Sequence, residues 1–156
     1  MRFTEIEELS QKAYLENVLN KYGVHASKPT PAPIVMGDSF GKHQCPKNQY
    51  ELEQMKAVPY ASTVGSLQYA QVCTCPDLSF VTGVLGRYQS NPGMEHWKMV
   101  KIALRYVRGT TGLMLTYRKS ESLEMEGYSD SDFAGDADDR KFTSGYIFTL
   151  AKGAIS

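Results

Sequence analysis

The spacing of apolar residues changes near Gly112, and this change constrains the fold more than any other feature of the chain. Before it, residues 59–109 carry apolar side chains at intervals of three and four, the period of an amphipathic helix. After it, apolar and polar residues alternate, the period of a strand. The sequence therefore predicts an α+β chain, with a helical module over residues 1–110 followed by a β-sheet over residues 111–156.

An amphipathic helix is expected over residues 11–22, with Ser10 as its N-cap and Gly23 just past its end. Its apolar face is Tyr14, Leu15, Val18, Leu19 and Tyr22. Three prolines in the run Lys28–Pro33 exclude a helix, because each lacks an N–H and disfavours helix at the residue before it. Residues 26–48 are therefore expected to run extended over the surface, with a short helix from about Gln49.

Two more apolar faces lie in the region 59–109. They are Leu78, Val81, Leu85 and Tyr88, and then Trp97, Val100, Ala103, Leu104 and Val107. Pro59 and Pro76 suit the first turns of helices. Asn91–Pro92 is expected to cap and open the last helix, and Gly109 to end it. His96 has no evident catalytic partner in the sequence and is interpreted as a surface or packing residue.

Three strands are expected after the change of period. They cover Leu113–Tyr117, Leu123–Asp130 and Ser144–Leu150, and a fourth begins at Ala154. Leu123 and Met125 alternate with glutamates, which predicts a strand with one buried face. A sheet that stopped within its fourth strand would have an open edge and an unfinished core, so we expect an incomplete sheet.

Charge is unevenly distributed although the formal net charge is zero. Residues 1–120 hold 14 Lys+Arg and 9 Asp+Glu, and residues 121–156 hold 3 and 8, so the two parts carry +5 and −5. The three cysteines form no framework and suggest a reduced protein. No apolar run approaches the ~18 residues of a membrane span, and no signal core is present. An intracellular location, cytoplasmic or nuclear, is expected.

A row of cations accompanies the last apolar face: Lys98, Lys101, Arg105 and Arg108. Steps of three, four and three place them on one arc of a helix. Such a row can follow a phosphate backbone, because each neutralised phosphate releases counterions. The alternative is a solvated helix face near a C-terminus, where the dipole favours cations, and spacing alone favours that alternative.

Asp130 opens an acidic cluster at the end of the second expected strand, and it is a candidate ligand for Mg²⁺. The other acids of the cluster are Asp132, Asp136, Asp138 and Asp139. A calcium loop is rejected because Lys141 stands where a bidentate glutamate belongs. A zinc site of His43, Cys45, Cys73 and Cys75 is disfavoured, because its spacing matches no common zinc module.

Many short motifs, in one order, resemble copia-type retrotransposon Pol. They begin with Ser10–Tyr14, the Lys28–Pro33 run, Val64-Gly65-Ser66-Leu67-Gln68-Tyr69-Ala70, Pro76-Asp77, Gly86-Arg87-Tyr88, Asn91-Pro92 and His96-Trp97-Lys98. They continue through Leu104-Arg105-Tyr106, Arg108-Gly109-Thr110, Gly127–Asp136, Asp139-Arg140-Lys141, Thr143-Ser144-Gly145-Tyr146 and Gly153–Ser156. The resemblance covers about residues 9–156, and a long ordered set is more specific than any one motif.

The resemblance implies a reverse transcriptase thumb and connection over residues 1–110 and the first strands of RNase H over residues 111–156. The parent would be an RNA-directed DNA polymerase and ribonuclease H that uses Mg²⁺. The cation row would then contact a template–primer duplex or an RNA–DNA hybrid, and Asp130 would be the first RNase H carboxylate and a metal ligand.

The same resemblance predicts a fragment that is not catalytic alone and binds no Mg²⁺ tightly. The polymerase's paired aspartates and the later RNase H acids have no match here, and the remainder of Pol would be the natural partner. The chain departs from the family at residues 1–8, which do not match the expected strand, at Cys75 in place of an arginine, and at Phe142 in place of a small residue.

Two alternatives stay open. The chain could be a working segment of a longer Pol polyprotein, or a retrotransposon-derived protein that binds another protein and has lost its nucleic-acid role.

Overall fold

The computed structural model describes residues 6–34, 40–118, 124–132, 143–150 and 153–154. The chain divides into two compact units. A helical unit spans Leu9–Leu115, and a strand unit combines Met1–Glu8 with Thr116–Ser156. The described residues mix helices with small sheets, which confirms the α+β class at this level. Each unit is described by itself.

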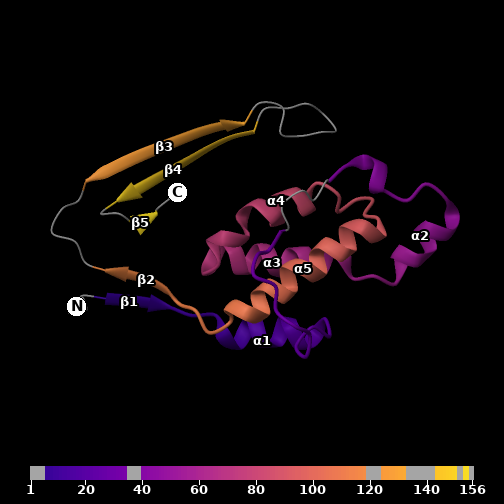
Figure 1. The fold of residues 1–156 in the computed structure, drawn as a ribbon, viewed down its shortest axis with the longest axis horizontal. Coiled ribbons are helices and arrows are strands. Elements are labelled where there is room, and N and C mark those ends of the chain that lie inside the picture. The colour runs from indigo at the N-terminus through magenta and orange to yellow at the C-terminus, as the bar shows by residue number, and fades with distance from the viewer. Residues whose placement is uncertain (1–5, 35–39, 119–123, 133–142, 151–152, 155–156) are drawn as a thin grey trace. The chain divides into compact units, whose positions relative to one another are not determined.

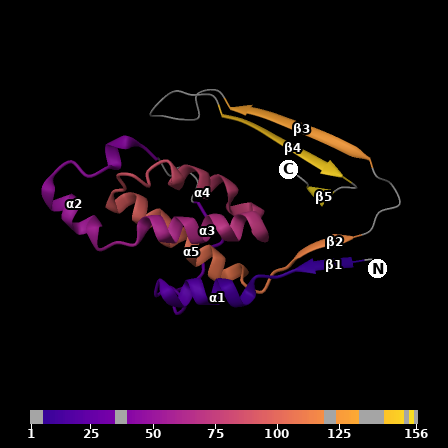
Figure 2. The same cartoon turned by 180° about the vertical axis from the view of Figure 1, so that it is seen from behind.

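The helical unit is built around its longest helix, α5 (Met94–Thr110). The other helices are α1 (Lys12–Lys21), α2 (Gln49–Lys56), α3 (Tyr60–Cys73) and α4 (Ser79–Gly86), with 3₁₀ turns η1 (Lys42–Gln44) and η2 (Pro76–Leu78). Helix α5 contacts α1, α3, α4 and η1, and it crosses the middle of the unit (Figures 1 and 2). The short helix expected from Gln49 is confirmed as α2, which Asn48 caps by accepting the Glu51 N–H at 2.9 Å.

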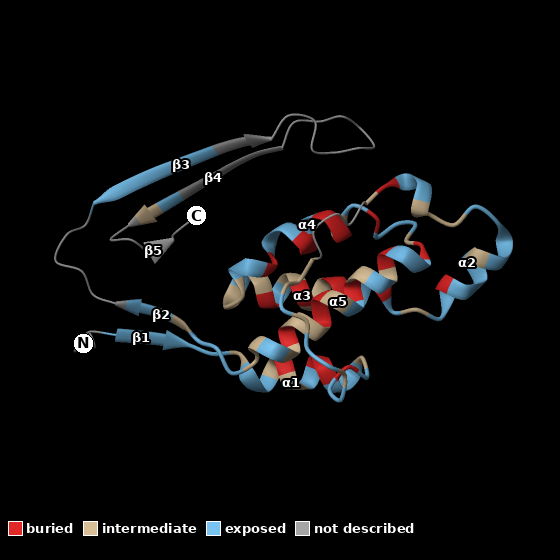
Figure 3. Ribbon diagram, in the orientation of Figure 1, coloured by how far each residue is buried: buried red, intermediate tan, exposed pale blue. Residues whose placement is uncertain are grey.

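Burial of one face of α5 makes the core. Val100, Ala103 and Leu104 are completely buried and Val107 nearly so, while Trp97 packs at the margin. They meet the buried residues of the other helices, Leu15, Val18, Leu19, Val64, Leu67, Ala70, Leu78, Val81 and Leu85. Figure 3 shows this burial along the facing sides of the helices. The apolar faces predicted from spacing are therefore confirmed, and each large aliphatic side chain contributes roughly 1.5–3 kcal/mol by leaving water.

Helix α1 ends at a left-handed glycine, as expected. Gly23 has φ +68°, its N–H donates to the Asn20 carbonyl at 3.1 Å, and the Val24 N–H donates to the Leu19 carbonyl at 2.9 Å. This pattern is a Schellman motif, and Val24 and Leu19 are both buried in the core, as the motif requires. The start differs from expectation, because Gln11 occupies the N-cap position. Ser10 Oγ still accepts the Lys12 N–H at 3.3 Å.

Both expected ends of α5 were wrong. The N-cap is Gly93, whose N–H donates to His96 Nδ1 at 3.0 Å, so a side chain in the first turn replaces the expected Asn91–Pro92 cap. His96 is completely buried and stacks on Tyr88 at 4.1 Å, which confirms it as a packing residue. Gly109 lies within the helix, which continues to Thr110.

Two prolines of the helical unit lie at the starts of helices, and one of them lies a position earlier than expected. Pro59 is the N-cap of α3 rather than a first-turn residue. Pro76 opens η2, as expected for a residue without an N–H to leave unpaired. Among the described residues between α1 and η1 there is no helix or strand, in agreement with the proline run.

The strand unit contains two small sheets among its described residues. Strand β1 (Ile6–Leu9) pairs with β2 (Leu115–Arg118), and β3 (Met125–Asp132) pairs antiparallel with β4 (Thr143–Leu150), which pairs antiparallel with β5 (Gly153–Ala154). The strands expected after Gly112 are confirmed within about two residues. Strand β1 was not expected, because residues 1–8 do not match the family pattern.

The expected buried face of β3 is wrong for this structure. Met125 of this face is 68% exposed, and Phe148 of β4, the register partner of Gly127, is 41% exposed. A sheet buries a face only where a second layer covers it. The described part of the strand unit holds no helix that could supply that layer.

Alanine at two glycines should change stability in opposite directions. Gly23→Ala places a Cβ at φ +68°, and we expect a loss of roughly 1–2 kcal/mol in the free energy of unfolding. Gly65→Ala lies inside α3 with no atom within 4 Å of the added Cβ, and we expect a gain of roughly 0.5–1 kcal/mol.

Urea denaturation followed by the helical circular dichroism signal measures both changes. The two variants serve as controls for each other, because each adds the same methyl group. Losses of equal size in both would contradict the assignment of Gly23 as a left-handed helix end.

Candidate nucleic-acid interface

The four predicted cations all belong to α5. Lys98 and Lys101 are exposed, and Arg105 and Arg108 are half-buried. With steps of three, four and three along an unbroken helix, they share one side of it, next to the buried face that starts at Val100. The helical placement of the row is thus as expected, and its contact with nucleic acid stays a prediction.

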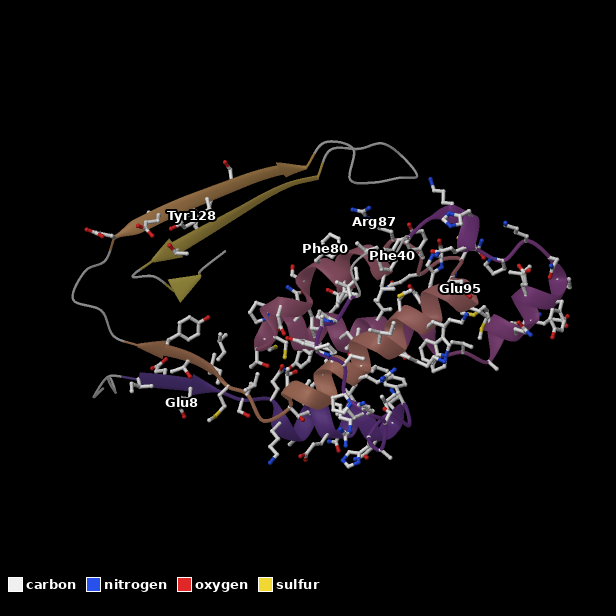
Figure 4. All side chains as sticks on the ribbon, in the orientation of Figure 1. Glu8, Phe40, Phe80, Arg87, Glu95 and Tyr128 are labelled. Atoms are coloured by element: carbon white, nitrogen blue, oxygen red, sulfur yellow. The ribbon has the colours of Figure 1, made fainter. Side chains whose placement is uncertain are left out.

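The first cation of the row is paired. Lys98 Nζ lies 2.6 Å from Glu95 Oε1, and both side chains are at least half exposed. Figure 4 shows Glu95 at the N-terminal end of α5, where the helix dipole also favours a carboxylate. Exposed pairs of this kind contribute only ~0–1 kcal/mol, so Lys98 can exchange Glu95 for a phosphate at little cost.

The two arginines of the row hold the segment between α1 and residue 35, which we call the strap (residues 25–34). Arg105 Nε donates to the Lys28 carbonyl at 2.7 Å, and Arg108 Nε donates to the His25 carbonyl at 2.6 Å. Thr30 adds a third attachment, because its Oγ1 donates to the Ile102 carbonyl at 3.1 Å and its N–H to the Arg105 carbonyl at 3.4 Å. The strap therefore runs antiparallel to α5, with successive strap residues meeting earlier helix residues.

Gly109 fits this arrangement. A Cβ at Gly109 would lie 3.2 Å from Pro29 Cβ and 4.0 Å from the Thr30 carbonyl oxygen. The glycine therefore gives the strap room to approach α5, which explains its place inside the helix. Sequence reasoning missed this role. The sequence contains a proline run and a glycine within a helical pattern, but neither feature shows that the two segments are in contact.

Bonding to the strap leaves the arginines positively charged. The acceptors are neutral carbonyl oxygens, and each guanidinium has five N–H donors in a planar fork, of which one serves the strap. The other N–H groups have the geometry that suits phosphate oxygens. The strap contacts thus fix the two side chains without neutralising them.

On another side of α5, Tyr106 donates a short hydrogen bond from its hydroxyl to Asp77 Oδ2 of η2. This bond, with burial and the charge of Asp77, raises the pKa of Tyr106 to about 12. Cys75 precedes Pro76 where the family resemblance has an arginine. Burial raises the pKa of the Cys75 thiol, so the position carries no charge at neutral pH and Tyr106 is the partner of Asp77.

Asp130 lies in β3 opposite Gly145 of β4, and the strand continues to Asp132. It therefore precedes the strand end by two residues, whereas the sequence placed it at the end. Asp136, Asp138 and Asp139 lie outside the described residues. Among the side chains that are described, no three of His, Cys, Asp or Glu come together as metal ligands. The role of Asp130 stays a prediction from the resemblance.

The disfavoured zinc site is not assembled in one place. His43 and Cys45 line a surface pocket of about 280 Å³ at the start of α5, together with Lys47, Glu51 and Glu95, and neither Cys73 nor Cys75 lines it. All three cysteines lie at half-buried positions, and none of them forms a disulfide. Separately, no helix within the described ranges is both long and apolar enough to cross a bilayer.

Known proteins that resemble this chain are transposon polyproteins and related sequences. It is 47% identical over 148 residues, 95% of its length, to the retrovirus-related Pol polyprotein from transposon TNT 1-94 of Nicotiana tabacum, of which it covers 11%. It is 35% identical over 148 residues to the Pol polyprotein from transposon RE2 of Arabidopsis thaliana, of which it covers 10%. It is also 43% identical over 102 residues to secreted RxLR effector protein 161 of Plasmopara viticola, covering 72% of that protein.

These similarities define the class: a segment of a retrovirus-related Pol polyprotein from a transposon. The chain belongs to the copia-type retrotransposon Pol family, and it spans about a tenth of the length of the polyproteins that it matches. No protein-family model matches the chain, and no solved structure matches it.

The Tyr106–Asp77 bond predicts a stability change at alkaline pH. A pKa raised from about 10 to about 12 stabilises the fold fully below pH ~10, and this contribution is lost as pH rises toward ~12. We expect Tyr106→Phe to be less stable than the unmodified chain at pH ~8 and to lose most of this difference by pH ~12.

Urea denaturation at both pH values measures the difference. Tyr50→Phe, which alters an exposed tyrosine of α2, controls for the loss of a hydroxyl. A Tyr106→Phe difference of the same size at both pH values would contradict the assignment of this bond.

Proposed function

We propose that this chain is the part of a copia-type Pol polyprotein that joins the end of the reverse transcriptase to the start of RNase H, and that its helical unit binds a nucleic-acid duplex. The parent activities would be RNA-directed DNA synthesis and cleavage of RNA in hybrids. The observation that carries the proposal is the cation row of α5, with two arginines held by the strap and two exposed lysines on the same side of the helix.

The chemistry of the row supports a backbone contact rather than base reading. Lysine and arginine neutralise phosphates without regard to sequence, and the affinity then falls steeply as salt rises. An RNA–DNA hybrid or a template–primer duplex presents phosphates along both strands, at spacings that a helix with one cation per turn can follow. The acids of the strand unit lie outside this helix, and the binding surface is thus basic although the chain is neutral overall.

Asp130 supports the part of the proposal that concerns RNase H. Its motif resembles the first RNase H strand, and the structure has residue 130 in the long strand β3, paired with β4. Cleavage of a phosphodiester by two Mg²⁺ ions needs several carboxylates around the metals. Asp130 would hold Mg²⁺ together with the other acids of the RNase H domain in the parent polyprotein, and by itself it would bind the ion weakly.

A second candidate function is a retrotransposon-derived protein that binds another protein. It is favoured by the similarity to the Plasmopara viticola protein, because the matched segment makes up 72% of that relative rather than a tenth of a polyprotein. A sequence of this kind therefore also occurs as the larger part of a shorter chain. This candidate predicts no salt-dependent affinity for hybrids, so the experiment below separates it from the leading proposal.

Replacing Lys101 tests the interface most directly. Lys101 is exposed and makes no contact with the strap, so Lys101→Ala removes a charge and leaves the fold intact. If one phosphate contact is lost, we expect the slope of log affinity against log salt to fall by about 0.9 and the affinity for an RNA–DNA hybrid to fall about eightfold at ~0.1 M salt. Fluorescence anisotropy over a salt series measures both quantities.

Lys56→Ala is the matched control, because Lys56 is an exposed cation at the end of α2 and is not a member of the row. We expect it to bind as the unmodified chain does. If both lysine variants lost the same affinity, the effect would come from net charge, and the cation row would not be the interface.

The role of Asp130 predicts the behaviour of the 156-residue chain with Mg²⁺. Since a single matched RNase H carboxylate cannot position two metal ions, we expect no cleavage of hybrid RNA by the purified chain. The assay uses a labelled hybrid, with intact ribonuclease H as the positive control. Cleavage by the purified chain that disappears in Asp130→Asn would contradict this prediction.

A further inference from the structure

The strap brings a fifth cation to the row of α5 from a distant part of the sequence. Lys28 is exposed, and its carbonyl oxygen accepts the Arg105 Nε–H at 2.7 Å, so its backbone touches the guanidinium. We propose that Lys28, Arg105 and Arg108 form one binding site for phosphodiester groups, assembled by the strap. This inference rests on the proposed function and adds to it, because it assigns part of the duplex-binding surface to a segment outside α5.

Three attachments place the strap along the helix. His25 meets Arg108, Lys28 meets Arg105, and Thr30 meets Ile102 and Arg105. Each attachment ends on a backbone carbonyl oxygen, of the strap for the arginines and of the helix for Thr30. No carboxylate takes part in these bonds, and the three cations keep their charge.

Holding like charges together has an electrostatic cost that a bound anion removes. Arg105 and Arg108 lie three residues apart on α5, and Lys28 touches Arg105 through its backbone, so the like charges on these side chains repel one another over distances comparable to the screening length of ~8 Å at physiological salt. A phosphodiester among them reverses the sign of each interaction. The arginine side chains are already fixed by their Nε bonds, so less conformational entropy is lost when their remaining N–H groups bind.

Prolines within the strap and a glycine of α5 keep the strap stiff and close to this helix. Pro29 and Pro31 fix their own φ angles and restrict the residues before them, which limits the conformations that the strap must give up. Gly109 lets Pro29 come within contact distance of α5. These features keep Lys28 next to the arginines, as a preassembled site requires.

Lys28→Ala tests the contribution of the strap's charge. The variant keeps the carbonyl oxygen that accepts from Arg105, so the strap should stay in place. We expect about an eightfold loss of affinity for an RNA–DNA hybrid at ~0.1 M salt and a salt slope lower by about 0.9. Lys12→Ala, which removes an exposed cation of α1, is the matched control and should bind as the unmodified chain does.

Thr30→Val tests the attachment of the strap at constant net charge. It removes the hydroxyl that donates to the Ile102 carbonyl, and we expect a roughly two- to fivefold loss of affinity as the strap loosens. Thr111→Val is the matched control, because the Thr111 hydroxyl, at the C-cap of α5, donates in the same way to a helix carbonyl, that of Arg108, and not to the strap. It should bind the hybrid as the unmodified chain does.

The outcomes separate this inference from the proposed function. If Lys101→Ala weakens binding while Lys28→Ala does not, the strap is not part of the site and the inference is wrong, although the proposed function stands. Tighter binding by Thr30→Val would mean that the strap covers the arginines, and this result would also overturn the inference. If the unmodified chain has no affinity for the hybrid, the proposed function is wrong, and the inference that rests on it is wrong as well.

Discussion

The burial of one face of α5 is the interaction on which the rest of the helical unit depends. Val100, Ala103, Leu104 and Val107 leave water, and α5 contacts α1, α3 and α4. Because that face must point inward, the cations at the flank of the helix are presented along its other side. Packing thus decides which way the basic row points. On an isolated helix, no buried face would fix the direction of the row.

The strap links the packing of the helical unit to the charged side chains of α5. A segment rich in proline has few backbone N–H groups to pair, yet its carbonyl oxygens still need donors. Arg105 and Arg108 supply those donors from α5, and Thr30 returns bonds to the helix backbone. The same two side chains therefore stabilise the fold and orient charge for a possible ligand. This double use suits a guanidinium better than an ammonium, since its planar fork keeps the remaining N–H donors in a fixed geometry while Nε binds the strap.

The strand unit shows the opposite situation. Strands β2, β3 and β4 form about where the sequence predicts them, but Met125, Tyr128 and Phe148 stay exposed. Strand pairing satisfies the backbone and does not by itself bury a face.

The sequence by itself determined the helices and the strands after Gly112, the buried faces of the helices, and the family. Periodicity is local, so Leu78, Val81 and Leu104 could be assigned to the core from spacing alone, and Gly23 to a helix end from its tolerance of positive φ. Only the tertiary structure decided that His96 caps α5 from within the core, that Gly109 sits inside a helix, and that Arg105 and Arg108 bind strap carbonyls. These are contacts between segments up to about eighty residues apart, and such contacts depend on how the helices pack, which no local pattern records.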